Sequence, residues 1–64
     1  MSEPYNVILR QERKKRGMTI EDMAEALGVS TITISSWERG KSRPKEESRN
    51  IIMEKLGIVL EVDA

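Results

Sequence analysis

The chain has 64 residues without cysteine or histidine, which excludes disulfides, thiolate or imidazole metal sites and catalysis that depends on either side chain. Eleven basic and eleven acidic side chains cancel to a formal net charge of zero, which argues against an indiscriminate polyanion binder. The apolar runs are far too short to span a membrane, so we expect one small, soluble, cytoplasmic domain that needs no metal or cofactor.

The charges are unevenly distributed along the chain. Residues 10–16 carry five basic side chains and one acidic, and residues 39–45 carry four basic and no acidic, whereas residues 46–64 carry five acids and two bases. A neutral chain with this distribution can present one positive face to a polyanion. A solvated helix surface and a solubilising loop would give the same pattern, so the clusters alone do not establish a binding site.

Two helices are predicted in the first half of the chain. Pro4 suits a first helical turn and apolar residues follow at helical spacing, so a helix is expected over residues 4–16, ending at Gly17. Thr19 is a good N-cap for a second helix, which ends at Gly28, where a left-handed residue is favoured.

A third helix is expected over Thr31–Glu38, after an N-cap at Ser30. The β-branched residues of the segment 29–37 favour a strand instead. The serine cap at one end and a glycine at the other nevertheless bracket a segment of helix length, so we expect the helix. A basic loop, residues 40–45, then leads to a fourth helix over residues 46–56.

The tail is predicted to be a strand over residues 58–62, which are rich in β-branched side chains. Ile58, Leu60 and Val62 would bury one face of that strand. A lone strand cannot satisfy its own backbone, so we expect these residues to pair with the same strand of a second copy and form a two-fold dimer. Pairing with residues 2–6 and a frayed terminus are the alternatives.

The spacing of Ala24, Gly28 and Ile34 is typical of a helix-turn-helix. Two helices joined by a short turn must approach closely at Ala24 and reverse direction at Gly28 without a Cβ clash. Ile34 then fills the angle between them. This geometry lets the second helix project from the body and enter a DNA major groove.

The segment from Leu9 to Gly57 resembles the Xre/Cro helix-turn-helix repressor family of the lambdoid phage type. The resemblance rests on Leu9-Arg10, Arg13, Gly17-Met18-Thr19, Met23-Ala24, Leu27-Gly28-Val29-Ser30, Ile34, Trp37-Glu38-Arg39-Gly40, Pro44 and Leu56-Gly57. It implies an all-α helix-turn-helix domain of four to five short helices, lambda repressor-like, over residues 1–57. The short C-terminal β-strand for dimerisation would lie in a tail over residues 58–64.

The same resemblance implies roles for individual residues. Arg13 on the first helix would pair with Glu38 at the end of the third helix as a structural contact. The helix Thr31–Glu38 would be the recognition helix. Its base-contacting residues would be Thr31, Ile32, Thr33, Ser35 and Ser36, and phosphate or minor-groove contacts would come from Thr19, Ser30, Lys41, Arg43 and Lys45.

Two positions depart from the family's usual pattern. Ile20 stands where relatives usually have a glutamine that binds a phosphate, so that contact is not expected here. Arg49 stands where relatives tend to bury an apolar residue.

The outward side chains of the recognition helix are short and uncharged. Without Arg, Gln or Asn, this helix cannot make bidentate contacts to guanine or adenine. Ile32 and the threonine methyl groups can instead pack on thymine methyls, so we predict specificity through thymine methyls, DNA shape and the basic loop. A core position is the alternative for Ile32, but Ile34 and Trp37 already define the inward face.

We therefore expect a homodimeric, sequence-specific regulator of transcription that binds double-stranded DNA and represses by occluding a palindromic operator. An Xre-like antitoxin or anti-repressor that acts mainly through a protein partner is the alternative. No enzymatic activity is expected, because the acidic residues look like first-turn or surface charges and imply no cleft.

Overall fold

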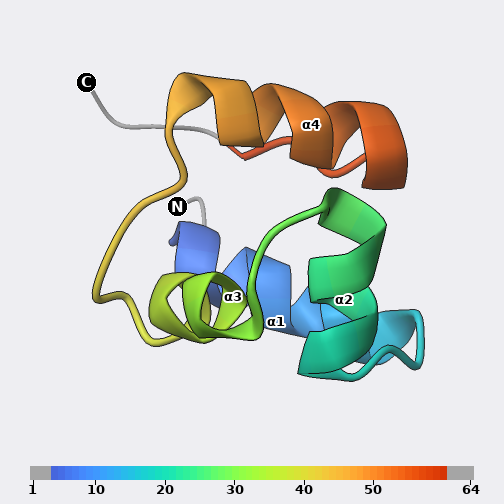
Figure 1. Ribbon diagram of the computed structural model, residues 1–64. Coiled ribbons are helices and arrows are strands. Elements are labelled where there is room, and N and C mark those ends of the chain that lie inside the picture. Colours follow the sequence, from blue (N-terminus) through green and yellow to red (C-terminus); the bar gives the residue numbers. More distant parts are fainter. Residues whose placement is uncertain (1–3, 61–64) are drawn as a thin grey trace.

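The computed structural model describes residues 4–60, and within them the chain forms four helices and no strand. The helices are α1 (Tyr5–Lys15), α2 (Ile20–Leu27), α3 (Thr31–Glu38) and α4 (Glu46–Leu56). Figure 1 shows α1, α2 and α3 grouped together, with α4 lying across one side of the group. The all-α fold is confirmed, and the third segment is a helix despite its β-branched residues. Each helix within residues 4–60 is too short or too polar to span a bilayer.

The connection between α2 and α3 depends on caps that the sequence supplies locally. The Thr19 hydroxyl accepts a hydrogen bond from the Asp22 N–H, and the Asp22 carboxylate accepts one from the Thr19 N–H, both at 3.0 Å, so a capping box begins α2. The helix ends at Gly28, whose φ of 71° is left-handed. A Cβ at Gly28 would meet no atom within 4 Å, so the glycine is needed for its backbone conformation and not for space.

One apolar core joins the four helices. Leu9, Met23, Ile34 and Ile52, one from each helix, are fully buried. Trp37 packs into the same cluster and is 5% exposed. Because α3 contributes both Ile34 and Trp37 to this core, its orientation is determined by packing, and its opposite side is left to solvent.

The expected C-terminal strand is absent from the part of the tail that the structure describes. Gly57, with a φ of 67°, ends α4, and the next residues run back along that helix without regular secondary structure (Figure 1). Ile58 and Leu60 are 4% and 8% exposed in the chain's own core, whereas Val59 is 66% exposed. The side chains alternate as predicted, but the apolar side packs on this chain, so its burial does not require a second copy. Val62 lies outside the described residues.

Candidate nucleic-acid interface

Helix α3 has a buried side and an exposed side. Ile34 and Trp37 are 1% and 5% exposed in the core, and Glu38 is 4% exposed. Ile32 is 76% exposed, so the expectation that it faces solvent is confirmed and a core position is excluded. The outward side of α3 therefore consists of short, uncharged side chains and one exposed isoleucine.

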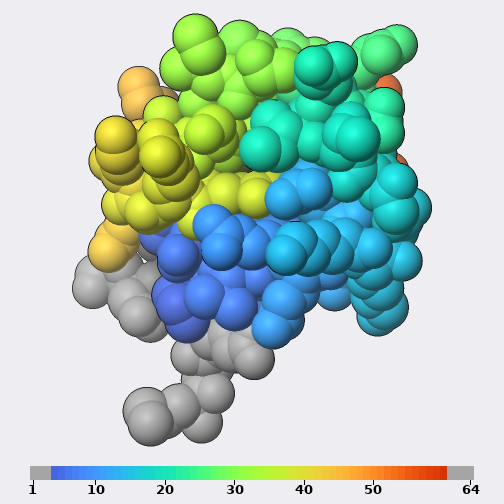
Figure 2. Space-filling view, turned by 90° about the horizontal axis from the view of Figure 1, so that it is seen from below, coloured from blue at the N-terminus to red at the C-terminus, as the bar shows by residue number. Residues whose placement is uncertain are grey.

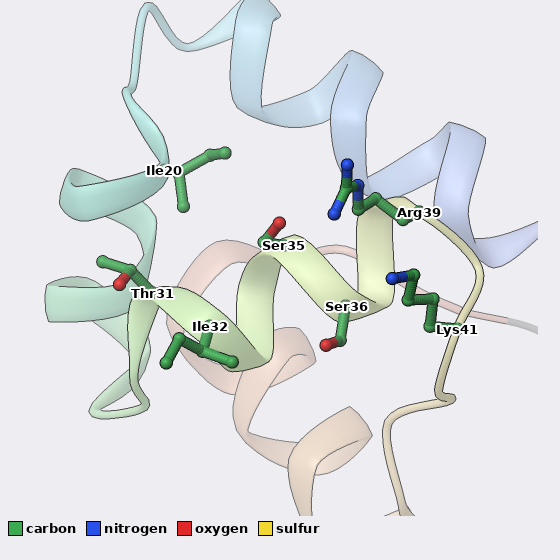
Figure 3. A pocket seen from close by; sticks show the side chains of 7 residues that line it. All are labelled: Ile20, Thr31, Ile32, Ser35, Ser36, Arg39 and Lys41. Carbon is green, nitrogen blue, oxygen red and sulfur yellow. The ribbon is translucent and has the colours of Figure 1, made fainter.

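An open hollow lies along the exposed side of α3, hereafter the recognition hollow (Figure 3). Its lining comes from the start of α2, from α3 and from the residues that follow α3. The lining residues are Ile20, Thr31, Ile32, Ser35, Ser36, Arg39 and Lys41. Four of the five predicted base-contacting residues are thus brought together, with one predicted phosphate-contacting lysine at the edge of the hollow.

Thr33 is the predicted base-contacting residue that is not among those lining the recognition hollow. Its hydroxyl lies 2.9 Å from the Ser30 hydroxyl, and its backbone N–H donates to the same Ser30 oxygen at 3.1 Å. Thr33 is half-buried and precedes Trp37 by one helical turn, so it lies at the border between the exposed and the buried sides of α3. A base contact by Thr33 stays a prediction.

Arg39 lines the recognition hollow, although it was not among the residues predicted to contact DNA. It is exposed at the C-cap of α3 and follows Ser35 by four residues, so both lie on one side of the helix. In Figure 3 its side chain extends from the end of α3 toward α1. The signal was present in the sequence, since Thr31, Ser35 and Arg39 share the four-residue spacing of one helical face.

Three basic residues of α1 adjoin the recognition hollow, and one of them, Arg13, is paired with Glu38. Arg10 and Lys14, about one helical turn apart, line a second hollow together with Arg39. Ile20 and Ser35 line both hollows, so the two surfaces are continuous. Figure 2 shows α1, the start of α2 and the end of α3 on one face of the molecule. The basic cluster of α1 therefore contributes cations beside the outward residues of α3.

The ion pair between Arg13 and Glu38 connects α1 to the end of α3. The Arg13 Nε donates to Glu38 Oε2 at 2.7 Å, and its Nη2 donates to Oε1 at 3.0 Å. Its Nη1 also donates to the Met18 carbonyl at 3.0 Å. The hydrogen bond with Glu38 raises the pKa of Arg13, and burial opposes that change. The pair keeps the remaining cations of α1 at a fixed distance from α3.

The basic loop carries three exposed cations, Lys41, Arg43 and Lys45. It begins directly after α3, where the Lys41 N–H donates to the Ser36 carbonyl at 2.9 Å. In Figure 3 the Lys41 side chain lies beside the end of α3. The loop therefore adds further cations beside α3, on the side away from the start of α2.

The two predicted phosphate-contacting hydroxyls, on Thr19 and Ser30, lie at the N-termini of α2 and α3. Each hydroxyl oxygen accepts a hydrogen bond as an N-cap, from Asp22 and Thr33 respectively. Both residues are exposed, and a helix N-terminus attracts an anion through its backbone N–H groups.

The sequence of this region matches a known family. Residues 9–60 match the Helix-turn-helix family (HTH_3), a span that contains all of α2, α3 and α4 and most of α1. The chain belongs to the Xre/Cro-type helix-turn-helix family. It is also similar to the HTH-type transcriptional activator BcrR of Enterococcus faecalis, with 37% identity over 57 residues. That match covers 89% of this chain and 28% of the relative, so the chain spans less than a third of the relative's length.

Membership of the Xre/Cro-type family confirms two expectations from the sequence. The resemblance recognised in the motifs is correct, and the chain belongs to a family of DNA-binding regulators that are not enzymes.

Within this family, the two unusual residues of the chain have structural roles. Ile20 packs against the core and lines both hollows, so it adds apolar surface to them. Arg49 is half-buried on α4, and its Nη1 donates to the Pro44 carbonyl at 2.9 Å. It therefore holds the end of the basic loop against α4.

Proposed function

We propose that this Xre/Cro-type domain is a sequence-specific regulator of transcription that places α3 in the major groove of double-stranded DNA. One observation carries the proposal: the recognition hollow presents short side chains between cations on both sides. Arg10 and Lys14 lie on the α1 side and Lys41 lies on the other. Phosphate contacts position a protein on the duplex, and the side chains between them contact base edges. Such a regulator acts in the cytoplasm, on nucleoid DNA.

We infer that the recognition hollow reads thymine methyl groups. Ile20, Ile32 and the Thr31 methyl supply apolar surface, and α3 itself carries no Arg, Gln or Asn for a bidentate base contact. Arg39 is assigned to the DNA backbone because it also lines the hollow that holds the α1 cations.

We further propose that two copies bind a palindromic operator and repress by occlusion. A two-fold dimer sets its recognition helices about 34 Å apart, which is one turn of DNA. The burial of Ile58 and Leu60 in their own chain supports a DNA-binding domain that extends through Leu60. The second copy then contacts exposed apolar residues instead, of which Met53 and Val59 are 52% and 66% exposed. A reporter with the operator placed across the promoter distinguishes repression from the activation that the name of BcrR describes.

A second candidate function is the binding of a protein partner, as in an antitoxin or anti-repressor. It is favoured by the exposed apolar side chains of α4 and the tail, since Ile51, Met53 and Val59 are all more than a third exposed. In that case DNA binding is secondary, and the partner interaction is insensitive to salt because it is apolar.

Selection of binding sites from random duplex DNA tests the proposed function. A palindrome and its spacing would report DNA binding, symmetry and specificity together. With about three to five phosphates bound per subunit, the affinity should fall steeply as salt is raised. Failure to bind any duplex at low salt would contradict the proposal, and capture of a defined protein by the same sample would then favour the second candidate.

A further inference from the structure

The basic loop has few backbone hydrogen bonds of its own. The N–H groups of Lys41 and Ser42 both donate to the Ser36 carbonyl, at 2.9 and 3.4 Å. In the described chain the next backbone donor is Arg49, which binds the Lys45 carbonyl at 2.8 Å. The middle of the loop is therefore held by side chains and not by its own backbone.

Tyr5, on the first turn of α1, makes two contacts with the middle of the loop. Its hydroxyl donates to the Ser42 carbonyl at 2.7 Å. Its ring lies beneath the Arg43 guanidinium, whose Cζ is 5.9 Å from the ring centroid, within the range of a cation–π interaction. The ring is half-buried and packs against the apolar core. The core thus fixes the tyrosine, and the tyrosine fixes the loop.

The far end of the loop is held by α4. Pro44 is buried, and its carbonyl accepts the hydrogen bond from the Arg49 guanidinium. Two loop carbonyls, of Ser42 and Pro44, are therefore each bound by a side chain from a different helix. Arg43 is an exposed residue between these two attachments, with its guanidinium over the ring of Tyr5.

We propose that Tyr5 is a positioning residue for DNA binding, which holds the basic loop beside α3 before the duplex arrives. The inference rests on the proposed function. A loop that is already ordered loses little conformational freedom on binding, so its cations bind phosphates at a lower entropic cost. The contact between Arg43 and the ring is weak because the site is exposed. The guanidinium can therefore leave the ring and bind a phosphate, while the hydrogen bond from Tyr5 to the Ser42 carbonyl stays in place.

Tyr5→Phe tests the proposal, because it removes the hydroxyl and keeps the ring. We expect the affinity for the selected duplex to fall about fivefold, the equivalent of one ordinary hydrogen bond. The slope of log affinity against log salt should stay unchanged, because the same phosphates are bound. Arg43→Ala, in contrast, should lower that slope by about one. Amide relaxation by NMR should show that residues 41–43 are more mobile in the free Tyr5→Phe variant than in the free wild-type chain. The mobility of the other residues should be unchanged.

A double-mutant cycle separates positioning from a general structural role. When Lys41 and Arg43 are both replaced by alanine, Tyr5→Phe should no longer change the affinity, because the loop has lost the cations that Tyr5 positions. The same fivefold loss in that background would overturn the proposal, as would a Tyr5→Phe variant with wild-type affinity or unchanged loop mobility. A wild-type chain that binds no duplex refutes the proposed function itself. A wild-type chain that binds, with an insensitive Tyr5→Phe variant, refutes the role of Tyr5 alone.

Discussion

Arg13 on α1 and Glu38 at the end of α3 form a bidentate ion pair with N–O distances of 2.7 and 3.0 Å, and the Glu38 side chain is only 4% exposed. Arg10 approaches the same carboxylate, with its Nε 3.7 Å from Oε1. The carboxylate therefore faces two guanidinium groups of α1. Loss of the carboxylate would leave Arg13 charged, largely buried and without its partner, which is the costly way to break such a pair.

Glu38→Gln should therefore destabilise the domain strongly, by about 3 kcal/mol of unfolding free energy. The measurement is urea unfolding followed by the fluorescence of Trp37, the single tryptophan of the chain. The matched control is Glu12→Gln, which breaks the pair between Glu12 and Arg16 on the same helix. Those side chains are 29% and 32% exposed, so the control should cost less than about 1 kcal/mol. If the two variants lost equal amounts of unfolding free energy, burial would not make the ion pair of Glu38 more important for stability than the exposed pair.

Lys14 and Lys15 offer a matched pair for testing the DNA-facing side of α1. Lys14 lines the second hollow with Arg39, whereas Lys15, rotated by about 100° on the helix, is not among its lining residues. Lys14→Ala should weaken duplex binding and lower the slope of log affinity against log salt by about one. Lys15→Ala removes the same charge from the neighbouring position and should leave the slope unchanged. Fluorescence anisotropy of labelled duplex at several salt concentrations measures both, and a wild-type slope for Lys14→Ala would exclude Lys14 from the interface.

The helices were predictable because their ends depend on a few adjacent residues. Thr19 and Ser30 cap α2 and α3, and Gly28 adopts the left-handed conformation that its place at a helix end favours. The exposure of Ile32 was also predictable, since Ile34 and Trp37 already occupied the inward face. The caps and the periodicity of a single helix contained the necessary information.

The parts that were not predictable depend on packing between segments. The sequence contains a cluster of bases at residues 10–16, but only the packing of α1 against α3 selects Arg10, Arg13 and Lys14 to line the second hollow. The alternation at Ile58 and Leu60 predicted an apolar side, but it carried no information about which chain would cover it. Arg39 is a different case, because its four-residue spacing from Ser35 was visible in the sequence, but it lies just past the last residue of α3 and a prediction confined to the helix leaves it out.

Thymine methyl groups should contribute directly to affinity if the recognition hollow reads them. Replacing one thymine of the selected site by deoxyuridine removes one methyl group and no hydrogen bond. We expect about a fourfold loss at each contacted thymine, equivalent to about 0.8 kcal/mol for one buried methyl-sized group. Ile32→Ala should bind more weakly and should lose most of this dependence. Deoxyuridine outside the selected site is the control, and a strict requirement for guanine opposite α3 would contradict methyl reading.

Substitutions in the tail test whether its apolar side chains are buried within one chain or between two copies. Because Ile58 is 4% exposed in its own core, Ile58→Ala should lower the free energy of unfolding by about 2–4 kcal/mol. The loss should be the same at low and high protein concentration, since no second chain is needed to bury this side chain. Val59→Ala, at a position 66% exposed, should change the unfolding free energy by less than about 0.5 kcal/mol. Urea unfolding at two concentrations a hundredfold apart, together with sedimentation of both variants, measures these effects. If Ile58→Ala weakened only the association of two copies and left the unfolding of a monomer unchanged, the tail would form an interface between chains.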